Sequence, residues 1–233
     1  MTAERTGMAE IVFEHVTHDF GAERVVDDVS LAQHERRVGI VGANGSGKST
    51  LARMINGLVS PASGRVLVDG LDVARRAREV RRRVGFVFTN ADNQIVMPTV
   101  REDVAFTLRR HRLDKADAAA RVDAVLERFG LTDLADRPAH RLSGGQKQLL
   151  ALASVLVAEP SIVVADEPTT LLDARNARRI AEYFASLDQR LVVVSHQLEL
   201  LEDFDRVIVM EDGRVVADDT AALALDAYRA LIA

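Results

Sequence analysis

The sequence contains no cysteine among its 233 residues. This absence excludes disulfides, thiolate metal sites and cysteine nucleophiles, and it fits a reducing compartment. The longest apolar run, residues 149–158, is far shorter than the roughly 20 residues that a membrane-spanning helix needs. Residues 1–10 are polar and lack the apolar core of a secretory signal. Any work at a membrane is therefore expected to depend on a partner.

A strong charge of one sign is also lacking. The formal net charge is −5, so we expect no general field for polyanions and no nucleic-acid partner. A local basic cluster is interpreted as the solvated face of a short helix; it consists of Arg75, Arg76, Arg78, Arg81, Arg82 and Arg83. With 48% hydrophobic residues, the chain can bury the core of one large α/β domain that carries an inserted lobe.

The apolar runs predict an α/β fold in which short strands come first. Runs near residues 11–13, 25–26 and 30–31, separated by a polar turn at 18–23, indicate an antiparallel sheet edge. A strand at 37–41 then leads into a glycine-rich loop and a helix at 51–58. Later apolar runs, at 162–165, 191–194 and 207–210, are typical of strands buried in a parallel sheet.

The middle of the chain reads as helical. We therefore predict one domain over 1–233, in which 1–89 and 159–233 form the core with its antiparallel β part and 90–158 form an inserted helical subdomain. Neither an internal repeat nor a low-complexity linker interrupts this order.

The glycine-rich loop matches the phosphate-binding pattern G-x-x-x-x-G-K-[ST] in full. Its glycines let backbone N–H groups surround phosphates, and the following helix adds a favourable dipole. Lys48 is expected to pair with the β and γ phosphates, and Ser49 to offer its hydroxyl to Mg²⁺. The weaker alternative is an ordinary glycine-rich turn. The predicted nucleotide-binding residues are Gly42, Asn44, Gly45, Ser46, Gly47, Lys48, Ser49 and Thr50.

Two adjacent acids end the apolar run at 162–165. Asp166 is expected to hold Mg²⁺ through water, and Glu167 to polarise the attacking water as a general base. Taken alone, such a pair would be equally well explained as a solvated turn. The phosphate-binding loop upstream favours the catalytic interpretation.

A second candidate phosphate cradle lies at Leu142, Ser143, Gly144, Gly145 and Gln146. A hydroxyl, two glycines and the start of a helix suit a γ-phosphate. The alternative is a helix N-cap with a flexible approach, and one chain needs only one such cradle for its own nucleotide.

These motifs, in this order and over nearly the whole chain, resemble the ATP-binding-cassette (ABC) ATPases. The resemblance implies a P-loop NTPase fold, with a RecA-like core of mostly parallel strands, an antiparallel β subdomain and a helical subdomain. It implies ATP and Mg²⁺ as cofactors. It also implies that two cassettes pack head to tail, so that 142–146 of one subunit contacts the ATP bound by the other.

Three more residues receive roles from the same resemblance. Phe20 falls where an aromatic ring stacks on adenine, although a core phenylalanine that anchors the turn is an alternative. Asp173 falls in the loop that crosses the dimer seam. His196 falls where a histidine contacts the γ-phosphate, although a histidine at a strand end is often only a solvated cap.

Residues 90–106, with Gln94 followed by the run PTVREDVAF at 98–106, resemble the ATPases of energy-coupling-factor (ECF) importers. Residues 35–41 and 93–98 resemble, within these importers, the ATPases of biotin importers. In ABC ATPases a glutamine that reaches Mg²⁺ and the attacking water ends the strand that precedes residues 90–106, whereas Thr89 stands here. Thr89 and Gln94 are the coupling candidates. Gln94 is expected to shape the helix that faces the membrane partner.

The resemblance implies an ATPase that powers the uptake of a vitamin or metal ion, with biotin favoured. Its expected partners are a second ABC ATPase subunit, identical or paralogous, and integral membrane subunits. The expected location is the cytoplasmic face of the cell membrane, as a peripheral protein. Two alternatives stay open: a soluble ABC ATPase of the iron–sulfur assembly type, and the ATPase of another ABC transporter.

Overall fold

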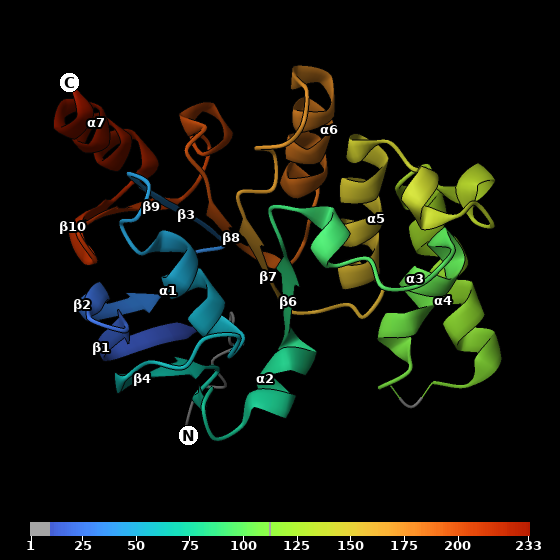
Figure 1. The fold of residues 1–233 in the computed structure, drawn as a ribbon, viewed down its shortest axis with the longest axis horizontal. Helices are drawn as coiled ribbons and strands as arrows, with labels where there is room; N and C mark the ends of the chain where they lie inside the picture. Colours follow the sequence, from blue (N-terminus) through green and yellow to red (C-terminus); the bar gives the residue numbers. More distant parts are fainter. Residues whose placement is uncertain (1–9, 112) are drawn as a thin grey trace, which may run out of the picture. The chain divides into compact units, whose positions relative to one another are not determined.

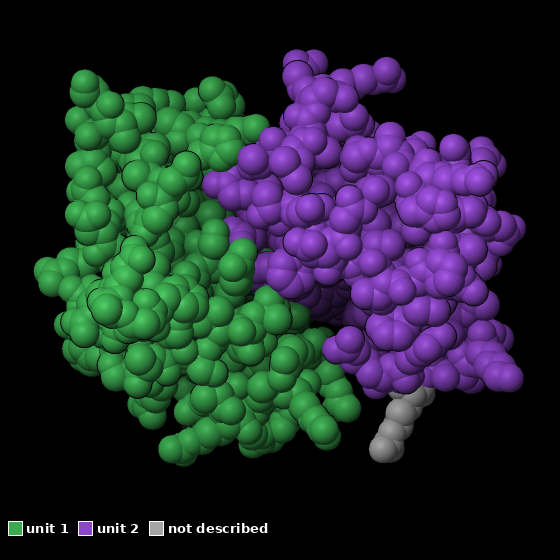
Figure 2. All heavy atoms as spheres, viewed as in Figure 1, with its two compact units in different colours: residues 1–84, 161–164, 188–233 green, residues 85–160, 165–187 purple. Residues whose placement is uncertain are grey.

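The computed structural model describes residues 10–111 and 113–233. The expectation that no secretory signal opens the chain concerns residues that lie, apart from Glu10, outside this part. The chain divides into two compact units, coloured separately in Figure 2. Unit 1 comprises 1–84, 161–164 and 188–233, and unit 2 comprises 85–160 and 165–187.

Unit 1 contains an antiparallel sheet near its N-terminal end (Figure 1). Its order is β2-β1-β4-β5, and its strands are β1 (Ile11–Phe20), β2 (Glu23–Gln33), β4 (Ser63–Val68) and β5 (Leu71–Asp72). The predicted turn at 18–23 is wrong, because β1 continues to Phe20 and the turn is confined to 21–22. Polar side chains persist in the strand since register shifts at 13–19 break its alternation.

A second group of strands in unit 1 has the order β10-β9-β3-β8, followed by the start of β7. The strands are β3 (Arg37–Gly42), β7 (Ile162–Asp166), β8 (Arg190–Val194), β9 (Arg206–Glu211) and β10 (Arg214–Asp219). β3 pairs in parallel with both β8 and β9, whereas β9 and β10 form an antiparallel pair. The predicted buried strands are confirmed, because β7 and β8 are buried at every residue.

Unit 1 also contains helices, namely α1 (Lys48–Ile55), α2 (Ala77–Arg83), the short η4 (Leu198–Leu200) and α7 (Ala221–Ile232). Of these, α1 and α7 pack against the strands of the unit. Helix α1 begins at Lys48, three residues before the predicted start at 51, and ends three residues before 58. The phosphate-binding loop therefore runs directly into a helix. In α2 only Val80 is buried, in keeping with a solvated basic face.

Unit 2 is mainly helical. Its elements are β6 (Val84–Val87), beside the end of β7, then η1 (Ala91–Asn93), α3 (Val100–Leu108), α4 (Lys115–Arg128), η2 (Thr132–Leu134), η3 (Ala139–Arg141), α5 (Gly144–Leu156) and α6 (Ala174–Ala185). The predicted helical segment 90–158 lies inside this unit, which also takes in β6 and α6. Its status as a separate subdomain stays a prediction.

Local sequence signals explain where the two central helices of unit 2 begin. Thr99 caps α3 and Ser143 caps α5, each in a reciprocal capping box with the side chain three residues on, Glu102 and Gln146. Helix α5 is buried along most of its length, which fits its place in the middle of the unit. Over the described residues, no helix combines the length and the apolar character needed to cross a bilayer.

Candidate functional site

The phosphate-binding loop of unit 1 runs close to two carbonyl oxygens. A Cβ on Gly42 would lie 2.1 Å from the carbonyl oxygen of Met210 in β9, and a Cβ on Gly47 would lie 2.1 Å from that of Val25 in β2. Both glycines also have positive φ angles, 152° and 93°. Gly45, with φ 85°, has open space where its Cβ would be. Glycine is therefore required at positions 42 and 47, where the loop packs against β9 and β2. At Gly45 the loop borders open space.

Lys48 is folded back onto its own loop. Its ammonium group donates hydrogen bonds to the carbonyl oxygens of Gly42 (2.8 Å) and Ala43 (2.7 Å), and to the hydroxyl of Ser46 (3.4 Å). The side chain is only 6% exposed. A buried ammonium needs such partners. A phosphate would have to replace some of these oxygens, so the loop presents a preformed positive charge.

His196 follows β8, which lies parallel to β3. Because Ile40 pairs with Val194, the ends of both strands meet at one edge of the sheet. The phosphate-binding loop leaves from β3 at the same edge. His196 itself is exposed, while Ser195 is fully buried. Unit 1 therefore places His196 near the strand that delivers the loop.

Phe20 ends strand β1 and is 57% exposed. Its ring and the His18 ring are nearly perpendicular, with the centroids 4.7 Å apart. An exposed ring at a strand end is available for stacking, whereas the alternative of a buried turn anchor does not fit this exposure. Both ring nitrogens of His18 are buried, and neither has a hydrogen-bond partner among the described residues. Stacking on adenine stays a prediction.

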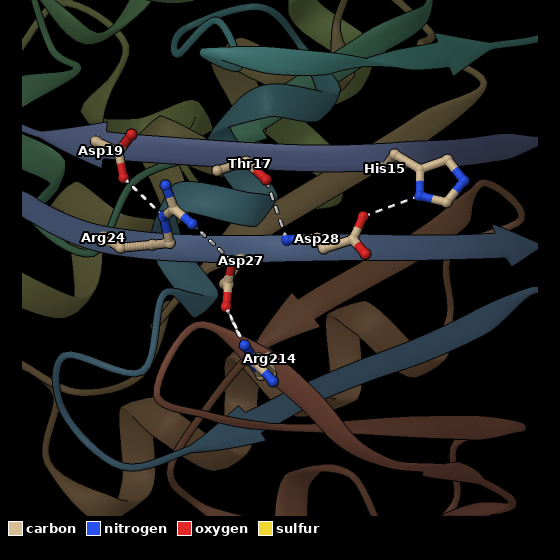
Figure 3. Close-up of polar contacts among 7 residues, drawn as sticks. All are labelled: His15, Thr17, Asp19, Arg24, Asp27, Asp28 and Arg214. Atoms are coloured by element: carbon tan, nitrogen blue, oxygen red, sulfur yellow. Dashed lines mark hydrogen bonds and ion pairs between the residues drawn. The ribbon is translucent and has the colours of Figure 1, made fainter.

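A charged network fixes the hairpin that carries Phe20 (Figure 3). The Arg24 guanidinium donates hydrogen bonds to the carboxylates of Asp19 (Nε to Oδ1, 3.0 Å) and Asp27 (Nη1 to Oδ1, 3.1 Å). Asp27 also accepts a hydrogen bond from Arg214 in β10 (2.8 Å), which holds the pKa of Asp27 below its ordinary value. The Asp27 amide bonds the carbonyl of Gly213 (2.9 Å). Sequence reasoning missed this network, since no motif or spacing marks it.

The acidic pair of unit 2 lies at the end of β7. Asp166 is 1% exposed, and Glu167 follows it with a φ of 50°. A left-handed backbone at a non-glycine residue is strained and recurs at functional sites. The hydroxyl of Thr170 donates to Oε2 of Glu167 (2.9 Å). This contact orients the carboxylate, in keeping with a positioned base.

The structure gives the second cradle the geometry of a helix N-cap. The hydroxyl of Ser143 accepts from the Gln146 amide, and the Gln146 side chain accepts from the Ser143 amide (2.9 Å). The N-cap alternative therefore describes the local structure, while Gly144 has open space where a Cβ would be. A role toward a partner's ATP stays a prediction.

Asp173 and the second cradle meet through one asparagine. Asp173 caps α6, accepting from the amide of Asn176 (2.8 Å) and from its side chain (2.9 Å). The hydrogen bond from the backbone amide of Asn176 holds the pKa of Asp173 below its ordinary value. A Cβ on Gly145 would lie 2.4 Å from Asn176 Cγ, so a larger residue there would displace the Asn176 side chain. Asn176 is a second contact that sequence reasoning missed.

Thr89 and Gln94 have different partners. The Thr89 hydroxyl donates to the backbone carbonyl of Asp166 (2.7 Å). The Gln94 side chain accepts from the Phe88 amide (3.2 Å) and donates to the Ala151 carbonyl in α5 (3.0 Å). Gln148 of α5 donates to the Phe88 carbonyl (3.2 Å). Gln94 thus ties the end of β6 to α5, a structural role that the sequence did not specify.

We expect Thr89→Gln to leave ATP hydrolysis largely intact. The Thr89 hydroxyl donates a hydrogen bond to the Asp166 carbonyl, and the loss of this bond should lower the free energy of unfolding by about 0.5–1.5 kcal/mol. Steady-state ATPase assays and thermal unfolding measure the two effects. Thr89→Ser, which keeps the hydroxyl, is the control. A large loss of turnover in the glutamine variant alone would show that this position takes part in the chemistry.

The predicted residues divide between the two units. Unit 1 contains the phosphate-binding loop, Phe20 and His196, whereas unit 2 contains the other candidates: Thr89, Gln94, the 142–146 cradle, Asp166, Glu167 and Asp173. Within unit 2, Thr89 reaches Asp166 by a hydrogen bond, and Asn176 joins Asp173 to the cradle. The roles assigned to these residues stay predictions.

The two predicted Mg²⁺ ligands lie in different units, Ser49 in unit 1 and Asp166 in unit 2. Each offers an oxygen atom, the ligand that Mg²⁺ prefers, and their assignment to one metal ion stays a prediction. Among the described residues, no group of three or more His, Cys, Asp or Glu could hold a metal by itself. Mg²⁺ bound together with the phosphates of ATP would not need such a group of protein ligands.

Comparison with known proteins gives consistent results. Residues 26–170 match the family model for ABC transporters. A biotin transport ATP-binding protein, BioM, of Rhizobium etli is 46% identical over 96% of this chain and 99% of its own. An energy-coupling factor transporter ATP-binding protein, EcfA2, of Symbiobacterium thermophilum is 44% identical over 88% and 76%.

A comparison with solved structures points to the same family. The chain cbiO1 of Clostridium perfringens, part of the ABC transporter complex cbiONQ, matches with a TM-score of 0.81 and 30% identity over 93% of this chain and 90% of that one. The predicted P-loop NTPase fold is thereby confirmed. The chain belongs to the ABC transporter family as an ATP-binding subunit, an ATPase whose hydrolysis of ATP is coupled to transport.

Proposed function

We propose that this chain is the ATP-hydrolysing subunit of an ECF-type importer, and that the cargo is biotin rather than a metal ion or another vitamin. The single observation that carries the proposal is the similarity to BioM over nearly the full length of both chains. The cassette itself has no expected contact with cargo, so cargo is inferred through the relatives.

The nucleotide chemistry follows from the residues of each unit. Lys48 supplies a fixed charge for the β and γ phosphates, and the N-terminus of α1 adds its dipole. Phe20 stacks on the adenine, and His196 contacts the γ-phosphate. Glu167 takes a proton from the attacking water as general base. Mg²⁺, held by Ser49 and by Asp166 through water, would neutralise phosphate charge.

A head-to-tail dimer accounts for the second cradle. Each chain carries both a phosphate-binding loop and an intact 142–146 motif, so two identical copies can form two equivalent composite sites. ATP then stabilises the closed pair, and hydrolysis releases it. Asp173 lies at the seam in this arrangement. A paralogous partner subunit would serve equally well.

A membrane subunit is proposed to dock at a pocket of unit 2. This open pocket has a volume of about 320 Å³ and a wall of mixed polarity, formed by Asp92, Ile95, Val96, Met97, Pro98, Ala139 and His140. Val96 is 63% exposed. A pocket that combines apolar side chains with a carboxylate and an imidazole suits a short amphipathic helix from an integral membrane protein. Such docking would hold the chain peripherally at the cytoplasmic face.

Isolation with native membrane partners tests the proposal. The chain is purified from membranes with its associated subunits, and the complex is tested for retention of labelled biotin, cobalt and nickel. We expect biotin to be retained. Retention of a metal ion instead would move the chain to another importer of this type. Recovery of a soluble scaffold protein, without membrane subunits, would favour the iron–sulfur assembly class and overturn the importer proposal.

We expect Gln94→Ala to weaken coupling to transport more than nucleotide binding. The substitution leaves the Phe88 amide without its side-chain partner, at about 1–3 kcal/mol for an unsatisfied group. It also removes the Gln94 bond to the Ala151 carbonyl, which keeps its own hydrogen bond within helix α5. ATP affinity and ATP-driven uptake in vesicles are compared. Asn93→Ala removes a neighbouring exposed amide and is the control. An equal loss of both activities in the Gln94 variant would argue against this division.

A further inference from the structure

A buried carboxylate in unit 2 has no part in the chemistry described above. Asp103, in the first turn of α3, is only 3% exposed. Its Oδ1 accepts hydrogen bonds from the backbone amides of Val96 (2.8 Å) and Met97 (3.0 Å). Its Oδ2 accepts from the hydroxyl of Ser154 in α5 (2.9 Å). Among the described residues it forms no ion pair, so its hydrogen-bond partners are all neutral groups.

These three bonds join elements that are distant in sequence. The amides of Val96 and Met97 belong to residues 92–98, termed here the docking segment, of which Asp92 and residues 95–98 line the pocket. Ser154 lies near the end of α5, the helix that starts at the 142–146 motif. Asp103 therefore bridges the docking segment and α5 through a single carboxylate.

A second set of contacts fastens the same segment at its start. Lys147 in α5 forms an ion pair with Asp92 (2.6 Å), and Gln94 bonds the Ala151 carbonyl. The segment is thus attached to α5 at three levels, namely Lys147, Ala151 and Ser154. These residues lie four and three positions apart, so they share one face of the helix.

We infer that Asp103 is a positioning residue that fixes the docking segment to α5, so that a displacement of the 142–146 motif reaches the docking pocket as a rigid-body movement. The inference rests on the proposed function, in which that motif contacts ATP bound by a partner. A buried carboxylate with three donors restricts the backbone at Val96 and Met97 more strongly than apolar packing, because hydrogen bonds are directional.

Hydrogen exchange at the amides of Val96 and Met97 tests the bridge in the chain alone. In Asp103→Ala we expect both amides to exchange about tenfold faster, as the loss of a charge-assisted bond predicts. Asp103→Asn keeps an acceptor oxygen for these amides and should restore most of the protection. Unchanged exchange in the alanine variant would overturn the inference.

The transmission step is tested by Ser154→Ala in the Glu167→Gln background, which is expected to retain ATP. ATP should slow exchange at Val96 and Met97 in the background chain. Ser154→Ala should reduce that ATP-dependent difference while leaving the difference at 142–146 in place. The control, Ser186→Ala, removes a hydroxyl bond of similar length to the Tyr183 carbonyl (2.8 Å) at the end of α6.

Two outcomes would contradict the inference: an ATP-dependent difference at Val96 and Met97 that persists unchanged in Ser154→Ala, or no such difference in the background chain. Neither outcome depends on membrane subunits or cargo. A failure here is therefore distinguishable from a failure of the importer proposal, which the retention of labelled biotin decides.

Discussion

Glu167→Gln is expected to lower ATP turnover by about 10²- to 10⁴-fold, the usual contribution of a general base. The amide cannot take a proton from water, yet it keeps the shape of the side chain and can still accept from Thr170. ATP-driven closure should therefore persist, and the variant should accumulate as an ATP-bound dimer. Steady-state ATPase assays and size-exclusion chromatography with light scattering measure the two effects.

A matched control is available in the same unit. Glu159 has nearly the same left-handed φ as Glu167, 51° against 50°, but its carboxylate pairs with Arg121. Glu159→Gln should hydrolyse ATP at the parent rate. Parent-like turnover in Glu167→Gln would remove the base assignment. A variant that stays monomeric with ATP bound would instead challenge ATP-driven closure.

Lys48→Ala is expected to weaken ATP binding by about 10- to 100-fold, since a charge-assisted hydrogen bond is worth about 1.5–3 kcal/mol. The same ammonium group also satisfies the carbonyls of Gly42 and Ala43, so the loop loses its internal partner. Calorimetric titration with ATP measures affinity, and thermal unfolding without nucleotide measures the structural part.

The folding effect can be separated from the binding effect. Arg53, in the last turn of α1, is a cation on the same helix that has no predicted contact with phosphate. Arg53→Ala should lower the unfolding temperature without changing ATP affinity. If Lys48→Ala bound ATP as tightly as the parent chain, the assignment of this loop as the phosphate site would fail.

The sequence predicted best where several residues must act together at fixed spacing. The phosphate-binding loop could be located because glycine, lysine and serine serve one purpose over a few adjacent positions, and the glycines at 42 and 47 prove to face the carbonyls of Met210 and Val25. Buried strands such as β7 and β8 were equally clear, since short, continuous apolar runs are typical of strands covered on both faces.

Contacts between distant residues could not be predicted in this way. Asp27 and Arg214 are separated by 187 positions, and neither lies in a motif. Asp103 could not be recognised as a buried bridge, because an acid in the first turn of a helix is ordinarily a solvated partner of the helix dipole. The turn expected at 18–23 was wrong for a related reason: register shifts let polar residues stay in β1.

Thr89 and Gln94, the two coupling candidates, differ in their hydrogen-bond partners. The resemblance to ABC ATPases predicts a glutamine at the position of Thr89, and the Thr89 hydroxyl donates a hydrogen bond to the Asp166 carbonyl. The side-chain amide of Gln94 accepts a hydrogen bond from the Phe88 amide and donates one to the Ala151 carbonyl. The sequence showed the departure from the family pattern, but only the structure showed that Gln94 connects to α5.

The most direct measurement of the central claim, that two copies share each ATP, is complementation between two inactive variants. Lys48→Ala disables the phosphate-binding loop, and Ser143→Arg disables the 142–146 motif. In a head-to-tail pair of one chain of each kind, one composite site is intact. Each variant alone should therefore be inactive, whereas the mixture should hydrolyse ATP. A mixture as inactive as its components would contradict the shared site.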